Sequence, residues 1–124
     1  MTGRTLKTGW TLAVAASLLI TAAGPATAKV EGDTIFLGAA LSLTGVYSTA
    51  GNHTKRGYDL AVKRINARGG VKVRKKSYKL KIIYYDDEST PARGAQLAER
   101  LIRQDGVKFM LGPYSSRLTE AVAE

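Results

Sequence analysis

The sequence predicts an α/β fold in which a doubly wound parallel sheet carries helices on both faces. Short apolar runs alternate with segments whose apolar residues repeat at helical spacing. The connections between the apolar runs are long enough for the right-handed crossovers that parallel strands require. In the second run Ile82 and Ile83 are adjacent, which indicates a strand buried on both faces of the sheet.

The first strand and helix are expected within residues 34–70. Residues 34–41 (TIFLGAAL) predict a buried strand, residues 42–50 a polar loop, and residues 51–67 a helix. Gly69 is expected to end that helix in a left-handed conformation. The predicted helix presents one apolar face (Tyr58, Ala61, Val62, Ile65) and one polar face (Lys55, Asp59, Lys63, Asn66).

The second unit begins with a basic turn at residues 71–77 and a strand at residues 80–85. A polar turn (Asp86, Asp87, Glu88, Ser89) follows the strand. Thr90 is expected to cap the next helix, which has Pro91 at its first position and Gly106 beyond its end. Its apolar stripe comprises Ala95, Ala98, Leu101 and Ile102, and Asp105 marks its polar end.

The third unit consists of a strand at residues 107–111 (VKFML), a turn at 112–116 and the start of a helix at 117–124. Three such units predict the strand order 2-1-3. Strands one and three would then be neighbours whose connections leave toward opposite faces. The crevice at such a switch point lies between loops 42–50 and 112–116, where a ligand is expected.

The turn at 112–116 places Ser115 and Ser116 at a helix N-terminus. Free N–H groups and the helix dipole favour an anion there, and a substrate carboxylate would fit. The alternative is that these serines only cap their own helix. Loop 42–50 adds hydroxyl and aromatic side chains (Thr44, Tyr47, Ser48, Thr49) but has neither of the glycine-rich spacings that cradle phosphate.

The carboxylates and the single histidine do not predict an enzyme. Asp86 and Asp87 are adjacent at a strand end, so their side chains point to opposite sides and would not share a substrate. Asp87 or Glu88 is expected instead to accept hydrogen bonds from N–H groups of the turn. His53 has no second ligand four residues away, so it predicts neither a metal site nor half of a catalytic triad. It is expected to be exposed. We expect no metal and no cofactor.

The first 28 residues resemble a secretory signal peptide. Arg4 and Lys7 precede a 13-residue, mostly apolar stretch at 11–23, and Ala26-Thr27-Ala28 offers a cleavage site. A membrane anchor is the alternative, but the stretch is shorter than the ~20 residues that a spanning helix needs. We therefore expect a domain at 29–124 that is exported to the periplasm.

Composition also bears on disulfides, lipid attachment and the partners of the chain. The chain has no cysteine, which excludes both a disulfide framework and the attachment residue of a lipoprotein. Its formal net charge of +9 raises the possibility of a nucleic-acid partner. The cations are spread over several elements, however, and are dense only at residues 71–81. Solvated faces are therefore the preferred interpretation, and export argues against a nucleic-acid partner.

Five segments together resemble the start of periplasmic solute-binding proteins that serve ABC transporters of branched-chain amino acids, amides and related solutes. They are residues 35–51 (IFLGAALSLTGVYSTAG), 57–71 (GYDLAVKRINARGGV), 84–90 (YYDDEST), 98–102 (AERLI) and 112–116 (GPYSS). The resemblance implies the type I periplasmic binding fold, in which two doubly wound lobes joined by a hinge close on a ligand. Residues 29–124 would be the truncated N-terminal part of the first lobe.

The resemblance also implies roles for individual residues. Ser116, with Ser115 beside it, would bind the ligand carboxylate, and Tyr47, Thr49 and Tyr114 would line the cleft. Ala50 stands where amino-acid binders of this family carry a tyrosine. An amide, another carboxylate or another amino acid is therefore as much expected as a branched-chain amino acid.

The implied partners are a small-molecule ligand and a membrane permease, with no nucleic acid. Two alternatives remain open. A ligand-sensing domain of a receptor or regulator could share this fold. An exported α/β enzyme would need a nucleophile elbow or a metal constellation, and the sequence shows neither.

Overall fold

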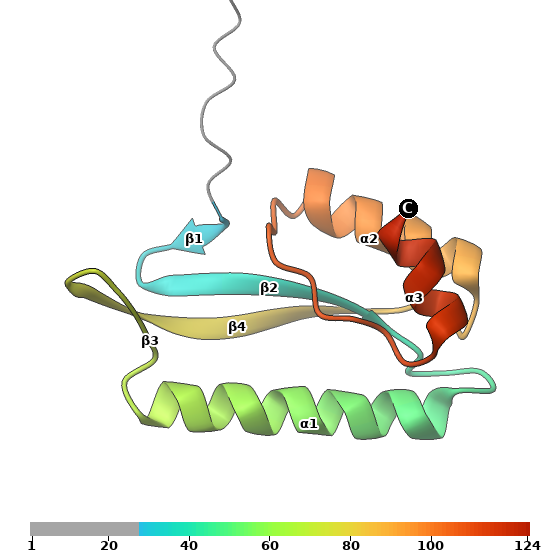
Figure 1. Ribbon diagram of the computed structural model, residues 1–124, viewed down its shortest axis with the longest axis horizontal. Helices are drawn as coiled ribbons and strands as arrows, with labels where there is room; N and C mark the ends of the chain where they lie inside the picture. The colour runs from blue at the N-terminus through green and yellow to red at the C-terminus, as the bar shows by residue number, and fades with distance from the viewer. Residues whose placement is uncertain (1–27) are drawn as a thin grey trace, which may run out of the picture.

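The computed structural model describes residues 28–124, so all of the predicted signal peptide except Ala28 lies outside the described residues. The described chain is a small sheet with α1 (Ser48–Ala67) on one face and α2 (Pro91–Arg103) and α3 (Ser116–Ala123) on the other (Figure 1). The predicted α/β fold is confirmed. No helix in the described part of the chain is long and apolar enough to cross a membrane.

Two parallel strands form the centre of the sheet. β2 (Thr34–Leu41) pairs with β4 (Lys76–Asp86) in register from Thr34 opposite Lys79 to Leu41 opposite Asp86. Helix α1 provides the crossover between them. The carboxyl half of β2 is buried. The predicted strand at 34–41 is confirmed, and the predicted strand at 80–85 is the inner part of a longer one.

Two short strands were missed by the sequence reasoning. Residues 71–77 are not a basic turn, because β3 (Val71–Val73) pairs antiparallel with the start of β4. The turn itself is only Arg74 and Lys75. Lysines suit such an outer strand, because charged side chains keep an exposed sheet edge from pairing with other chains. β1 (Val30–Glu31) pairs antiparallel with the start of β2.

The expected third strand lies beside β2 but makes a single parallel bridge. The Gly38 N–H donates to the carbonyl of Phe109 (3.0 Å), and the Leu111 N–H donates to the carbonyl of Gly38 (2.8 Å). The order of the regular strands is therefore β1-β2-β4-β3 rather than simply 2-1-3. Because β1 pairs with the start of this same edge of β2, a full-length third strand cannot form there.

Helix α1 begins at Ser48, three residues before its predicted start. Tyr58, Val62 and Ile65 are partly buried as expected, whereas Ala61 is exposed. The prediction that Asn66 points to solvent is wrong. Its side-chain amide donates to the Leu80 carbonyl (2.9 Å) and accepts from the Leu80 N–H (2.8 Å). Asn66 thereby satisfies backbone groups of β4 that lie beyond the end of β3.

Lys55 is also turned toward the sheet, with its Nζ 4.5 Å from the centre of the Tyr84 ring. At the other end of α1, Gly69 has φ +99°, as its predicted helix-ending role requires.

Helices α2 and α3 pack against each other over β2. Pro91 begins α2 as predicted, but Thr90 makes no side-chain capping bond. Its hydroxyl instead donates to the Glu88 carbonyl at 3.3 Å. Ile102, expected in the apolar stripe, is exposed, whereas Leu97, which was not expected there, is buried. The buried apolar core contains Ala39, Ala40, Leu41, Leu97, Ala98, Leu101, Val107 and Leu118.

Candidate functional site

The loop after β2 is held by a carboxylate at the end of β4. β2 and β4 are parallel, so their carboxyl ends meet at one edge of the sheet. One carboxylate oxygen of Asp86 accepts from the N–H groups of Leu43 (3.0 Å), Thr44 (3.2 Å) and Glu88 (2.9 Å). Its other oxygen accepts from the Thr44 hydroxyl (2.7 Å). Asp86 therefore fixes Leu43 and Thr44 against the end of the neighbouring strand.

These hydrogen bonds also determine the ionisation of Asp86. Burial alone would raise its pKa, because it disfavours the charged form. The bonds donated by Thr44, Glu88 and Leu43 stabilise the carboxylate and lower the pKa below its ordinary value. Asp86 is thus held as an anion by hydrogen bonds that the protein donates to both of its oxygens.

Asp87 points into the protein and has a different set of partners. It is fully buried, and its Oδ1 accepts from the Ser42 hydroxyl (2.6 Å) and the Ser89 N–H (2.8 Å). The sequence predicted that these adjacent carboxylates would not face one substrate together, and the structure agrees. The expectation that Asp87 satisfies the turn is confirmed. Glu88 does not do so, and its carboxylate lies 3.7 Å from the Arg93 guanidinium.

Ser89 connects the same two loops a second time. Its hydroxyl donates to the Thr44 carbonyl (2.8 Å) and accepts from the Tyr47 N–H (3.0 Å). Gly45 adopts φ +80°, and a Cβ at this position would collide with Ser89. The backbone on both sides of Tyr47 is therefore fixed before α1 begins.

The structure brings Tyr47 and Tyr114 together at this edge. Their ring centroids lie 6.1 Å apart with an interplanar angle of 59°. The turn at 112–116 is also held by Tyr58, whose hydroxyl donates to the Gly112 carbonyl (2.8 Å). Burial raises the pKa of Tyr58, so this hydroxyl stays protonated as a donor. The two predicted loops are therefore neighbours.

The two serines of the turn have different environments. Ser115 is the N-cap of α3, with φ +86°, and its Oγ accepts from the Leu118 N–H (3.3 Å). Ser116 is the first residue of α3 and is exposed. The alternative that these serines cap their own helix therefore holds for Ser115. Thr49 is exposed in the first turn of α1, and no hydrogen bond within residues 28–124 joins it to the turn.

Asp86, Ser89 and Tyr58 were missed by the sequence reasoning as residues that shape this edge. A signal for Asp86 was present, since it is the last residue of a buried parallel strand beside a polar loop. His53 is exposed, as predicted. Among the described residues, no group of three or more His, Cys, Asp or Glu side chains lies close enough to hold a metal ion.

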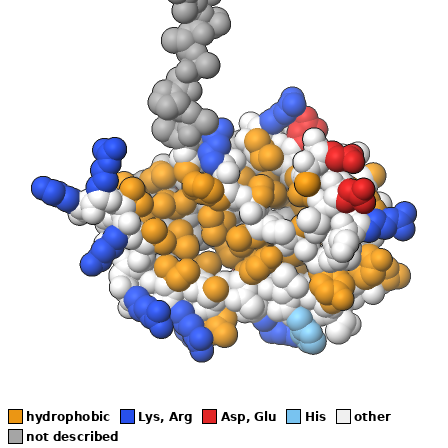
Figure 2. Space-filling model, viewed as in Figure 1, with side chains coloured by type: hydrophobic (Ala, Val, Ile, Leu, Met, Phe, Trp, Pro, Cys, Tyr) orange, Lys and Arg blue, Asp and Glu red, His pale blue; other side chains and the backbone are white. Residues whose placement is uncertain are grey.

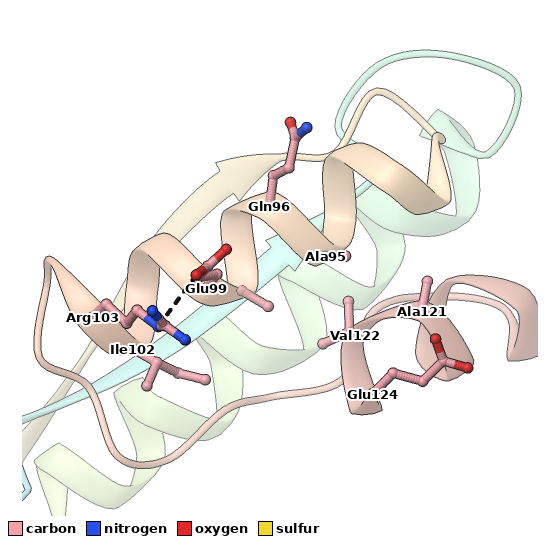
Figure 3. A pocket seen from close by; sticks show the side chains of 9 residues that line it. Ala95, Gln96, Glu99, Ile102, Arg103, Ala121, Val122 and Glu124 are labelled. Carbon is pink, nitrogen blue, oxygen red and sulfur yellow. Dashed lines mark ion pairs between the residues drawn. The ribbon is translucent and has the colours of Figure 1, made fainter.

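Two cavities lie away from this edge. One, of about 540 Å³, lies between α2 and α3 (Figure 3). The side chains of Glu99 and Arg103 point toward one another there and form an ion pair at 3.2 Å. The second, of about 420 Å³, is apolar and lies at the other end of the sheet. Neither of these two cavities is lined by the predicted site residues.

Comparison with known proteins identifies the family. A model of the family described as periplasmic binding protein matches residues 34–124. The Leu/Ile/Val-binding protein homolog 2 of Brucella abortus (strain 2308) is 34% identical over 82 residues, covering 66% of this chain and 21% of that protein. The Leu/Ile/Val-binding protein of Escherichia coli (strain K12) is 30% identical over 83 residues, covering 67% of this chain and 21% of that protein.

Solved structures agree with the sequence comparison. The branched-chain amino acid transporter substrate binding protein of Streptococcus pneumoniae, solved with isoleucine, superposes with a TM-score of 0.66 at 29% identity. The superposed region covers 72% of this chain and 24% of the Streptococcus pneumoniae chain. A solute binding protein of an ABC transporter from Rhodopseudomonas palustris, solved with 3,4-dihydroxybenzoic acid, has a TM-score of 0.62 at 25% identity. The superposed region covers 74% of this chain and 24% of the Rhodopseudomonas palustris chain.

The chain thus spans about a fifth of the length of the curated relatives that it matches. The family match extends from the first residue of β2 to Glu124, so it includes both loops of the candidate site. The chain belongs to the periplasmic binding protein family.

Proposed function

We propose that this chain forms part of the first lobe of a periplasmic, non-enzymatic solute-binding protein, which delivers a small carboxylate or amide ligand to an ABC permease. The observation that carries the proposal is the convergence of loop 42–47 and turn 112–116. They meet through Tyr47 and Tyr114 at the carboxyl edge of the sheet, and open α/β sheets bind ligands at such edges. The names of the similar proteins support the same function.

The proposed site uses the start of α3 for the ligand carboxylate. Ser115 is occupied as the helix cap, so Ser116 supplies the free hydroxyl, together with unpaired N–H groups in the first turn. Tyr47 and Tyr114 would flank the ligand, and Thr49 would line the rim. Asp86 and Asp87 would act only by fixing the loops.

The ligand class follows from what the start of α3 can recognise. A helix N-terminus with a free hydroxyl favours an anionic or strongly polar group. The solved relatives described above hold isoleucine and 3,4-dihydroxybenzoic acid, two ligands that share a carboxylate. A carboxylate bound at Ser116 would be common to many solutes, and the remainder of the ligand would be selected elsewhere.

Energetics limit what this chain achieves alone. Two or three charge-assisted hydrogen bonds contribute ~1.5–3 kcal/mol each, and association costs at least ~4 kcal/mol. The chain is therefore expected to bind its ligand no more tightly than about millimolar. Tight binding would require a second lobe that excludes water from the ligand.

The test is a titration of the chain with isoleucine and with benzoate, followed by the backbone amide resonances. We expect millimolar binding that shifts the amides of Tyr114, Ser116 and their neighbours. Ser116→Ala should weaken binding at least fivefold, while the exposed control Arg56→Gln on α1 should leave it unchanged. Shifts confined to α2, or no effect of Ser116→Ala, would contradict the proposed site.

The proposed export has its own test. The chain should be recovered from the periplasm with Lys29 as its first residue, as N-terminal sequencing would show. Recovery of an uncleaved chain in the cytoplasm would contradict the predicted signal peptide, without bearing on the ligand site.

A further inference from the structure

The β3–β4 hairpin forms a cationic end of the molecule. Its six cations are Lys72, Arg74, Lys75, Lys76, Lys79 and Lys81. None of them takes part in an ion pair within residues 28–124. Figure 2 shows Lys and Arg side chains around the end of the molecule where Figure 1 places this hairpin, with no acidic side chain beside them in that view.

Some of these cations form hydrogen bonds within the protein and others do not. Lys79 donates to the Asn66 carbonyl (2.6 Å) at the end of α1, and Lys76 donates to the Gly32 carbonyl (3.2 Å). Lys72, Arg74 and Lys75 are exposed and make no hydrogen bond within the described residues. These three, at the tip of the hairpin, are available to an external anion.

The backbone at the tip gives an independent observation. Val73 is paired with Lys76, so Arg74 and Lys75 are the two turn residues. Arg74 adopts φ +55°, a conformation that favours glycine. The turn therefore carries a cation at a position where glycine would fit with less strain. Arg74 thus adds an exposed cation at the tip of the hairpin.

The tip lies at the end of the fold where the described chain begins. Ala28 and Val30 line the same apolar cavity as Val71 and Val73 of the hairpin. Figure 1 shows β1 and the hairpin at the same end of the sheet. Until it is cleaved, the predicted signal peptide would be joined to the chain at this same end, next to Ala28.

The nearby carboxylates do not cancel this charge. Glu31 lies 3.5 Å from Lys29, and Asp33 is exposed in the turn that follows β1. Two carboxylates against the six hairpin cations leave this end positive.

We propose that the β3–β4 hairpin docks on a membrane surface that carries anionic phospholipid headgroups, with Lys72, Arg74 and Lys75 as the contacting cations. The proposal goes beyond solute binding and depends on the proposed function only for export, which brings the chain to a membrane. A cluster of this size matches the clusters of four to eight basic residues that bind anionic lipid surfaces.

The test measures cosedimentation of the full 124-residue chain with vesicles of 30% phosphatidylglycerol in phosphatidylcholine, and with pure phosphatidylcholine. The variant Lys72→Gln/Arg74→Gln/Lys75→Gln is compared with the control Arg56→Gln/Lys63→Gln/Arg117→Gln, which removes the same charge from exposed residues elsewhere. Any contribution of residues 1–27 is common to all of these proteins.

At low salt the hairpin variant should bind anionic vesicles about a hundredfold more weakly, since each of the three cations near such a surface is worth roughly a factor of five. The control should change less than threefold. Equal losses in both variants would overturn the proposal, because net charge alone would then explain binding. Tighter, hairpin-dependent binding to a 20-base-pair DNA duplex at the same salt would overturn it in favour of nucleic acid. The assay contains no solute, so its failure is distinguishable from failure of the solute site.

Discussion

Replacing Asp86 with alanine tests whether one carboxylate holds the loop that leads to the candidate site. The substitution removes the acceptor of four hydrogen bonds, three of them from Leu43 and Thr44 and one from the Glu88 N–H. The N–H groups lie at the rim of the fold, where water can replace the lost acceptor in part.

The expected cost follows from these bonds. A net contribution of ~1 kcal/mol per hydrogen bond gives an upper value of ~4 kcal/mol, and partial rehydration reduces it to ~2–3 kcal/mol. Such a loss is large against a typical stability of ~5–15 kcal/mol for a domain. The control Glu99→Ala removes a carboxylate from an exposed ion pair on α2, and should change stability by less than ~0.5 kcal/mol.

Urea unfolding of the chain at pH 7, followed by far-UV circular dichroism, measures both costs. A double-mutant cycle with Thr44→Val isolates the 2.7 Å bond between the Thr44 hydroxyl and Asp86. We expect a coupling energy of ~0.5–1.5 kcal/mol between the two substitutions. If Asp86→Ala costs no more than Glu99→Ala, or if the cycle shows no coupling, Asp86 does not fix the loop and the reasoning is refuted.

Three further predictions concern stability. Gly51→Ala should destabilise the fold by more than ~2 kcal/mol, because the added Cβ would collide with the Ser42 backbone. Gly57→Ala in the same helix has open space around the added Cβ and should stabilise the fold by ~0.5–1 kcal/mol. Equal shifts of the melting temperature for the two variants would contradict this prediction. Arg74→Gly should raise stability by up to ~1 kcal/mol by relieving its positive φ, and a loss of stability in urea unfolding would argue against the strained turn. Folding lowers the pKa values of Asp86 and Asp59, so their contribution to the free energy of unfolding should be complete well above pH 4 and be lost as the pH falls through and below that value. If Asp86→Asn leaves this dependence of stability on pH unchanged, the lowered pKa of Asp86 is contradicted.

The sequence predicted the elements that repeat a clear pattern. Residues 34–41 are apolar apart from Thr34 and proved to be a strand with those bounds. Pro91 at the start of α2, and Gly69 and Gly106 beyond the ends of α1 and α2, were predictable because each conformation favours a particular residue type. The neighbouring position of the two site loops followed from topology alone.

The remainder depends on contacts between distant residues. β3 is only three residues long, with Lys72 between two valines at a sheet edge, and its sequence pattern is as compatible with a loop as with a strand. Asn66 was assigned to solvent because its polarity suits a helix surface. Only the pairing of α1 with β4 shows that it replaces a missing strand at Leu80. Two of the residues that bond to Asp86, Leu43 and Thr44, likewise lie more than 40 residues away in the chain.

The single bridge at Gly38 has a consequence for motion. Residues 107–111 are joined to β2 by two backbone hydrogen bonds, whereas β2 and β4 are paired over the whole of β2. Local opening of this segment breaks few bonds, so the Leu111 amide should exchange with solvent much faster than amides shared by β2 and β4. The same segment carries the turn that ends at Ser116. A ligand held there would suppress this opening, and slowed hydrogen exchange at Leu111 would report occupancy of the site from a residue outside the proposed ligand contacts.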